Sequence, residues 1–206
     1  MIDLFLSAFI TFFVVIDPPG CAPNYASLTK GTSSAQRRNM AFRAIFVASL
    51  ILLVFALFGE ELLAALHIEL NSFRIAGGIM LFLIAIDMVF EKRTERREER
   101  AQKIIDTPEI EDVSVFPMAM PMIAGPGSIA SVMLLMAQND GLDRAGIILA
   151  ALAAVLVLTL LALLAAGPLM RVLGANAEAV ITRLLGVLLG ALAAQFVIDG
   201  LRESFL

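Results

Sequence analysis

Six apolar segments follow one another along the chain, and short polar stretches separate them. Each segment is close to the length of about 20 residues that a helix needs to cross the hydrocarbon core of a bilayer. The pattern therefore predicts an all-α membrane protein with six transmembrane helices. The predicted spans run from about Leu4 to Leu28, Ala41 to Phe58, Phe73 to Phe90, Val113 to Ala137, Ala145 to Gly167 and Val180 to Ile198.

Two of the predicted spans are interrupted. Proline and glycine break the first span at Asp17–Gly20 and the fourth at Gly125–Gly127. Proline removes a backbone donor and glycine adopts geometries that other residues avoid, so both stretches should stop a helix. Within hydrocarbon, each freed backbone group is costly unless protein or a water-filled cavity satisfies it. We therefore expect each break to lie where something polar binds.

The two halves of the chain resemble each other. The Pro-Gly pair at 19–20 matches the pair at 126–127, and an Arg-x-x-Gly motif opens the third span at Arg74 and the sixth at Arg183. Because each half has three spans, an odd number, the second half must insert upside down relative to the first. Inverted repeats with matching helix breaks are typical of secondary transporters. We predict a single transmembrane domain made of repeat 1 (about 1–90), a charged cytoplasmic linker (91–112) and repeat 2 (about 113–206).

Lysine and arginine gather in the predicted loops between spans one and two, three and four, and five and six. By the positive-inside rule, this bias places those loops in the cytoplasm and both termini on the outer side of the membrane. The composition agrees with a membrane location, since 60% of the residues are hydrophobic and only 17% are charged. Soluble proteins average about a quarter charged residues.

Charge and composition also argue against several classes of protein. A net charge of −4 argues against a nucleic-acid partner. Cys21 is the only cysteine, so we expect no intrachain disulfide and no multi-cysteine metal site. We also expect no cofactor. An intramembrane enzyme would need a nucleophile with a base or a metal triad, but the single histidine, His67, lies outside the predicted spans. We predict that the protein is not an enzyme.

The two breaks supply the candidate site residues. A new half-helix is expected after each break, over Cys21–Leu28 and over Ser128–Ala137, and the free N–H groups at their starts would form an anion site with Ser128 adding a hydroxyl donor. Asp17 would accept a substrate ammonium, carry a coupling proton or cap the following half-helix, and these alternatives stay open. Asn24 lies on the new half-helix and would hydrogen-bond either a substrate or the facing break. The candidate substrate-binding residues are Asp17, Pro19, Gly20, Cys21, Asn24, Gly125, Gly127 and Ser128.

The residues around both breaks resemble signature motifs of the MarC family. The segment DPPGCAPNYASLT, which starts at Asp17, resembles the family's D-P-x-G-x-x-P-x-[F/Y]-x-x-L-T motif. The segment FPMAMPMIAGPGSI, which starts at Phe116, is similar to its second signature, P-x-x-x-P-x-x-x-G-P-G-x-I. The chain departs from the family at Cys21, where asparagine is frequent, and at Ala130, where serine or threonine often stands. The resemblance implies a bacterial or archaeal inner-membrane transporter of small neutral amino acids, usually glycine and alanine.

The combined prediction is a secondary transporter that moves small neutral amino acids across the inner membrane by alternating access. Asp17 is the candidate for proton coupling. Tight packing around the break glycines would favour glycine, alanine or serine over leucine. A channel-like pore, or an exporter of another small metabolite, would use the same paired half-helices and is the alternative. The expected partners are the substrate and the lipid bilayer, and glycine-rich helix faces would serve packing either within the chain or between copies of it.

Overall fold

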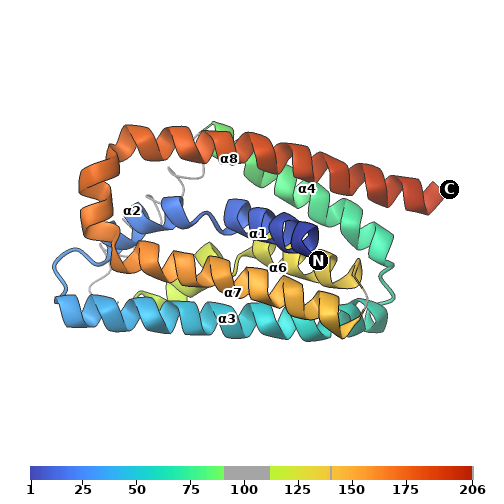
Figure 1. Cartoon of the computed structure of the whole chain (residues 1–206), viewed down its shortest axis with the longest axis horizontal. Helices are drawn as coiled ribbons and strands as arrows, with labels where there is room; N and C mark the ends of the chain where they lie inside the picture. The colour runs from blue at the N-terminus through green and yellow to red at the C-terminus, as the bar shows by residue number, and fades with distance from the viewer. Residues whose placement is uncertain (91–111, 140, 206) are drawn as a thin grey trace.

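The computed structural model of the chain describes residues 1–90, 112–139 and 141–205, without the side chains of 168–178. Among these residues every regular element is a helix (Figure 1). Apart from Asp112, the predicted linker lies outside the described residues. The elements are α1 (Ile2–Ile16), α2 (Pro18–Leu28), α3 (Ser34–Ala65), α4 (Leu70–Val89), η1 (Ser114–Ile123), α6 (Pro126–Ala137), α7 (Leu142–Leu164) and α8 (Ala166–Phe205).

The structure confirms the predicted all-helical membrane fold. Five helical stretches are long and apolar enough to cross a membrane, and the bent pair of η1 and α6 supplies a sixth. Large apolar side chains such as those of Phe46, Leu50 and Leu83 are exposed on the outside of the spans, where lipid would cover them. Both termini lie toward the same end of the molecule in Figure 1.

The long helix α3 extends beyond its predicted apolar segment at both ends. Its start is fixed by a capping box: the backbone N–H of Gln36 donates to Ser33 Oγ at 3.2 Å, and the backbone N–H of Ser33 donates to Gln36 Oε1 at 3.1 Å. Two of the N–H groups at the start of the helix are thereby satisfied. The phenol of Tyr25 donates to the carbonyl of Arg37, which ties the first turn of α3 to α2.

The first break is narrower than predicted. Only Asp17 leaves the helical geometry, with a left-handed φ of 58° and ψ of 66°. The helix resumes at Pro18 rather than at Cys21, because proline at the first position of a helix needs no hydrogen-bonded N–H and already has the required φ. α1 and α2 therefore remain one apolar span, Ile2–Leu28, of 27 residues.

The second break has a different shape. η1 is a π-helix in which Phe116 and Met120, each directly before a proline, have extended backbone angles. A residue before proline is pushed out of the helical region by a clash with the proline ring. η1 and α6 meet at a bend of 53°. The two breaks thus occupy matching positions in the sequence but differ in local geometry.

Each broken span packs mainly against helices of the other half of the chain. α1 lies against α7 as η1 lies against α3, and α2 contacts α7 and α8 as α6 contacts α3 and α4. α4 and α8 form the most extensive pair and run side by side in Figure 1. This exchange of partners is the pattern that two inverted repeats would give, although the repeat itself stays a prediction.

Glycines let α4 and α8 approach each other closely within the chain. A β-carbon placed on Gly78 would lie 2.8 Å from the backbone oxygen of Ala193, and one on Gly186 would lie 2.8 Å from Met88 Cβ. The glycine-rich faces predicted for helix packing are therefore used inside one molecule. Pairing between copies of the chain remains a prediction.

A buried charge lies near the start of α4. The Arg74 side chain is only 6% exposed and forms a 2.5 Å ion pair with Glu203 of α8. The partner lies on a helix far away in the sequence, which is why the sequence pattern alone did not indicate it.

Candidate functional site at the two helix breaks

The structure brings the two breaks together. A β-carbon on Gly127, at the start of α6, would lie 3.2 Å from Val15 Cγ1, two residues before Asp17, and 2.8 Å from Ile84 Cδ1. α1 also contacts α6, and α2 contacts η1. No larger residue fits at Gly127 without moving its neighbours, so the interior around the breaks is narrow.

Asp17 caps the half-helix that follows it. Its side chain is fully buried, and Oδ1 accepts a hydrogen bond of 3.1 Å from the backbone N–H of Gly20. The sequence left three roles open for Asp17: binding a substrate ammonium, carrying a proton, and capping the helix. The observed hydrogen bond is the one that a helix cap makes. The cap also places a carboxylate beside the start of α2, where an incoming anion would have to compete with it.

The start of α2 offers no free backbone donor in this structure, so the anion site predicted there lacks the donors that the sequence suggested and stays a prediction. Pro18 and Pro19 carry no N–H. The N–H of Gly20 is bonded to the Asp17 carboxylate, and the N–H of Cys21 donates to the Asp17 carbonyl at 3.0 Å. Pro19 and Gly20 therefore shape the half-helix rather than offer donors to an anion.

The start of α6 differs, because it keeps two backbone donors. Gly125 is the N-cap and has no side chain to accept from them, and Pro126 occupies the first helical position. Among the described residues, the N–H groups of Gly127 and Ser128 have no acceptor. Two adjacent N–H groups at the positive end of a helix dipole form an anion site. Among the described residues at the two breaks, free backbone donors therefore remain only at the start of α6.

Cys21 and Ser128 make the same contact in the two halves. The Cys21 thiol donates to the carbonyl of Ile16 at 3.4 Å, and the Ser128 hydroxyl donates to the carbonyl of Ile123 at 2.8 Å. Each side chain reaches back five residues, across the break, to the last residue of the preceding helix. The hydroxyl of Ser128 donates its hydrogen in this contact, so its predicted role as a donor to an anion stays a prediction.

Gly125 is required by the tight bend before α6. A β-carbon at this position would overlap the carbonyl oxygen of Pro121 in the preceding turn. The residue therefore sets the geometry that presents the two N–H groups at the start of α6.

Two buried polar oxygens lie one turn beyond the breaks without hydrogen-bond partners among the described residues. The Asn24 amide donates to the carbonyl of Gly20 at 2.7 Å, while its Oδ1 is unpaired. Ser131 Oγ is unpaired as well, and the side chains of Asn24 and Ser131 are 4% and 0% exposed. Leaving such an atom buried and unpaired costs about 1–3 kcal/mol, so each of the two atoms calls for a donor.

Sequence reasoning identified Asn24 but missed Ser131. Asn24 follows Gly20 by four residues, and Ser131 follows Gly127 by four residues. The comparison of the two halves at their Pro-Gly pairs therefore held the signal for Ser131. A serine in an apolar helix usually bonds to its own preceding turn, which made the residue unremarkable.

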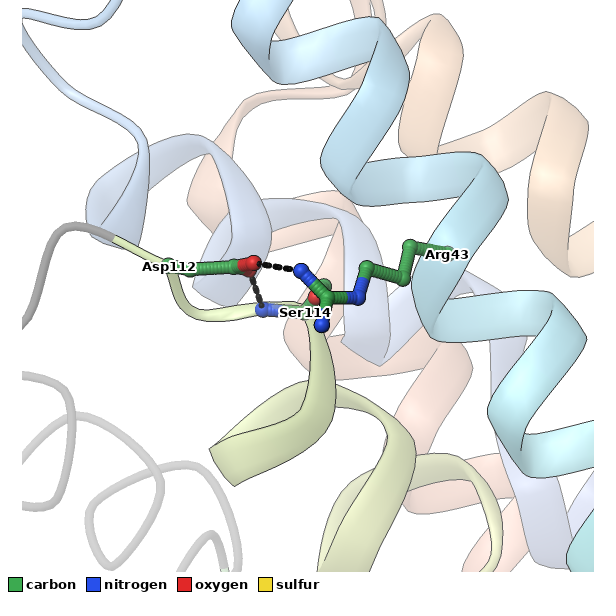
Figure 2. Close-up of polar contacts among 3 residues, drawn as sticks. All are labelled: Arg43, Asp112 and Ser114. Carbon is green, nitrogen blue, oxygen red and sulfur yellow. Dashed lines mark hydrogen bonds and ion pairs between the residues drawn. The ribbon is translucent and has the colours of Figure 1, made fainter.

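An ion pair joins the start of the second broken span to α3 (Figure 2). Arg43 Nη1 lies 2.5 Å from Asp112 Oδ2, and the backbone N–H of Ser114 donates to Asp112 Oδ1 at 2.9 Å. Burial alone would raise the pKa of Asp112, but the contacts with Ser114 and Arg43 outweigh it and lower this pKa below its ordinary value. The carboxylate is therefore charged at neutral pH and holds η1 against α3.

Two cavities lie beside the half-helices that follow the breaks. One, of about 320 Å³, lies at the end of α2 and is lined by residues that include Tyr25, Thr29 and Arg37. The other, of about 360 Å³, lies at the end of α6 and is lined by residues that include Met136 and Glu60.

The fold and the two joined breaks define a multi-pass helical membrane protein with an interior polar site. The chain belongs to the MarC family of integral membrane proteins, whose family model matches residues 2–205. It is 35% identical to a membrane protein of Methanocaldococcus jannaschii, over 100% of this chain and 99% of that one. It is 33% identical to the membrane protein YvbG of Bacillus subtilis, over 100% and 97% of the two chains. It is also 33% identical to the inner membrane protein YhgN of Escherichia coli, over 96% and 95%. No solved structure matches the chain.

Proposed function

We propose that this protein is a secondary transporter that moves small neutral amino acids across the inner membrane by alternating access. One observation carries the proposal: two broken spans meet in the interior and leave unpaired polar atoms buried beside them. Helix breaks at membrane depth are costly unless they line a site for something polar. Paired breaks of this kind are the usual construction of substrate sites in transporters with inverted repeats.

The chemistry at the breaks suits a zwitterion. The N–H groups of Gly127 and Ser128 at the start of α6 would bind the carboxylate of the substrate. Asn24 Oδ1 accepts hydrogen bonds and would receive the substrate ammonium, with the Asp17 carboxylate nearby along the chain. This arrangement revises the site predicted from the sequence, because it assigns the anion to α6 alone.

The narrow interior supports a small substrate. A β-carbon on Gly127 would lie 2.8–3.3 Å from the side chains of Ile84, Val15 and Leu81, which is closer than van der Waals contact. Glycine has no side chain and alanine only a methyl group, so these substrates would displace the packed side chains least, whereas leucine would have to displace several of them. Size selection of this kind results from overpacking, which costs about 1–3 kcal/mol for each unfavourable insertion.

The orientation and location follow from charge and from relatives. The lysines and arginines of the loops support an orientation with those loops in the cytoplasm and both termini outside. YhgN of Escherichia coli, which shares 33% identity with this chain, is named as an inner membrane protein. We assign the same location to this chain.

Uptake of labelled alanine into proteoliposomes tests the proposal. We expect saturable uptake that excess unlabelled glycine blocks and that leucine or lysine leaves unchanged. The matched variant is Gly127→Ala, whose methyl group would lie 2.8 Å from the flexible end of the Ile84 side chain and should lower uptake, while its melting temperature reports on folding. Flux that rises linearly with alanine concentration would instead indicate a pore. Absence of alanine uptake by folded protein would refute the proposed substrate.

A further inference from the structure

We propose that the solute reaches the helix breaks through two vestibules on opposite faces of the membrane and passes Asn24 from one face and Ser131 from the other. The vestibules are the two cavities described above, here named the α2 vestibule and the α6 vestibule. The proposal rests on the transport function proposed above and supplies its path and its polar contacts.

The α2 vestibule lies where the end of α2, the start of α3 and the end of α7 come together. Its polar lining consists of Thr29, Ser34, Arg37 and Arg38. Its volume of about 320 Å³ is several times the roughly 30 Å³ that a water molecule occupies in the liquid. A small amino acid therefore fits inside with part of its hydration shell.

The α6 vestibule lies where the end of α6, the start of α7 and the end of α3 come together. It has a volume of about 360 Å³, and its charged lining residues are Glu60 and Glu61 of α3. Met133 and Met136 line it from α6. These side chains are unbranched and flexible, so they can adjust to a passing solute.

The two vestibules occupy equivalent places in the two halves. Each lies at the end of the half-helix that follows a break, between the start of one long helix and the end of the other. α3 contributes to both, with Arg37 near its start and Glu60 near its end. At a rise of about 1.5 Å per residue these positions are about 35 Å apart, more than the roughly 30 Å thickness of the hydrocarbon core. The vestibules therefore open on opposite faces of the membrane.

Asn24 and Ser131 lie on the half-helices between the vestibules and the breaks. Asn24 directly precedes Tyr25 of the α2 vestibule, and Ser131 lies two residues before Met133 of the α6 vestibule. Both side chains are buried and each leaves one oxygen unpaired. A solute that carries an ammonium group would supply the missing donor at each step. Since both residues are shielded from solvent, this structure is closed on both sides of the breaks.

The two vestibules carry opposite charges. Arg37 and Arg38 make the α2 vestibule basic, and Glu60 and Glu61 make the α6 vestibule acidic. Two charges at about 8 Å in water-like surroundings change the local concentration of a singly charged reagent about fivefold at low ionic strength. An anionic thiol reagent should therefore react faster in the first vestibule, and a cationic one faster in the second.

Cysteine labelling tests the vestibules without any transport measurement. The background is Cys21→Ser, because Ser128 makes the equivalent contact in the other half. Ala26→Cys and Ala137→Cys place a thiol in the α2 and the α6 vestibule, and Leu50→Cys is the control on the lipid-facing surface. Anionic and cationic methanethiosulfonates are applied to protein in liposomes that are open to reagent on both faces.

We expect both vestibule thiols to react and the thiol at position 50 to remain unmodified. The thiol at position 26 should react about fivefold faster with the anionic reagent, and the thiol at position 137 about fivefold faster with the cationic one. Failure of either vestibule thiol to react above the control, or equal rates with both reagents, would overturn the proposed path.

The polar steps are tested in the uptake assay. Asn24→Ala and Ser131→Ala should each lower alanine uptake about tenfold, because a hydrogen bond worth about 1.4 kcal/mol is lost at each step. Ser131→Thr, which retains the hydroxyl, should recover most of the activity, and the melting temperature of each variant reports on folding. Full activity of Ser131→Ala would remove this residue from the path. Vestibules that label as expected in a protein without alanine uptake would support the path and refute the substrate. Alanine uptake by a protein whose vestibule thiols do not react would support the substrate and refute the path.

Discussion

Replacing Gly78 by alanine should loosen the pair of helices α4 and α8. A β-carbon at this position would lie 2.8 Å from the backbone oxygen of Ala193 and 2.8 Å from Val197 Cγ2. Carbon atoms pack best at about 3.5 Å or more, so the two helices would have to separate locally by about 0.7 Å. Because one of the two neighbours is backbone, a change of side-chain rotamer cannot relieve the overlap.

Gly190 provides a matched control on the same pair of helices. A β-carbon there would lie 3.6 Å from Ala85 Cβ, which is an ordinary van der Waals contact. Replacing a helical glycine by alanine gains about 1 kcal/mol of helix propensity at either position. Overpacking costs about 1–3 kcal/mol and applies to Gly78 alone. We therefore expect Gly190→Ala to raise the free energy of unfolding by up to about 1 kcal/mol. The free energy of unfolding of Gly78→Ala should be about 1–3 kcal/mol lower than that of Gly190→Ala.

Thermal unfolding of both variants in the same detergent, followed by size-exclusion chromatography, measures this difference. Gly78→Ala should unfold at a lower temperature than the unmodified protein, and Gly190→Ala at the same temperature or a higher one. If Gly78→Ala were as stable as Gly190→Ala, the close approach of α4 and α8 at Gly78 would not exist in the folded protein.

Three further predictions concern charged residues. Asp112→Asn should remove part of the pH dependence of the free energy of unfolding. Because the pKa of Asp112 is lowered in the folded state, its contact with Arg43 stabilises the protein fully above the ordinary pKa of 3.8. This stabilisation is lost as the pH falls through the folded-state pKa. Unfolding curves between pH 7 and pH 3 that coincide in shape for both proteins would contradict this. Glu203→Gln should destabilise the protein by about 1–3 kcal/mol, because the buried guanidinium of Arg74 loses its carboxylate partner while water still reaches the half-exposed position 203. An unchanged melting temperature would contradict the ion pair. Asp17→Asn should keep the helix cap, which asparagine also provides, but should abolish stimulation of alanine uptake by a proton gradient. Uptake with the same gradient dependence would remove Asp17 as the coupling residue.

The spans could be predicted from the sequence because hydrocarbon imposes a length and an apolar composition that few soluble helices share. Their ends were less predictable. α3 extends beyond its apolar segment because a capping box at Ser33 starts the helix in a polar stretch. The ion pair between Arg74 and Glu203 joins two helices from different halves, and a single sequence carries no signal for such a contact.

The breaks were found for the right reason, but their chemistry was only partly predicted. Proline was counted as a helix breaker in the first span, yet Pro18 stands at the one helical position where proline costs nothing. The free donors expected at the start of α2 are absent because the number of free N–H groups depends on each residue in the first turn, including the cap at Asp17. Ser131 was missed because only the structure shows that its hydroxyl does not bond to its own helix.

The exchange of helix partners between the two halves has a consequence for how the protein is made. α1 and α2 emerge first during synthesis, but the helices that they pack against, α7 and α8, begin only at Leu142 and Ala166. Until then the first span must remain in the membrane with Asp17 and the polar side of Asn24 facing lipid or another protein. Neither half can reach its final packing alone. A nascent chain that stops before Leu142 should therefore be short-lived and should need a membrane chaperone or insertion machinery to shield its first helix.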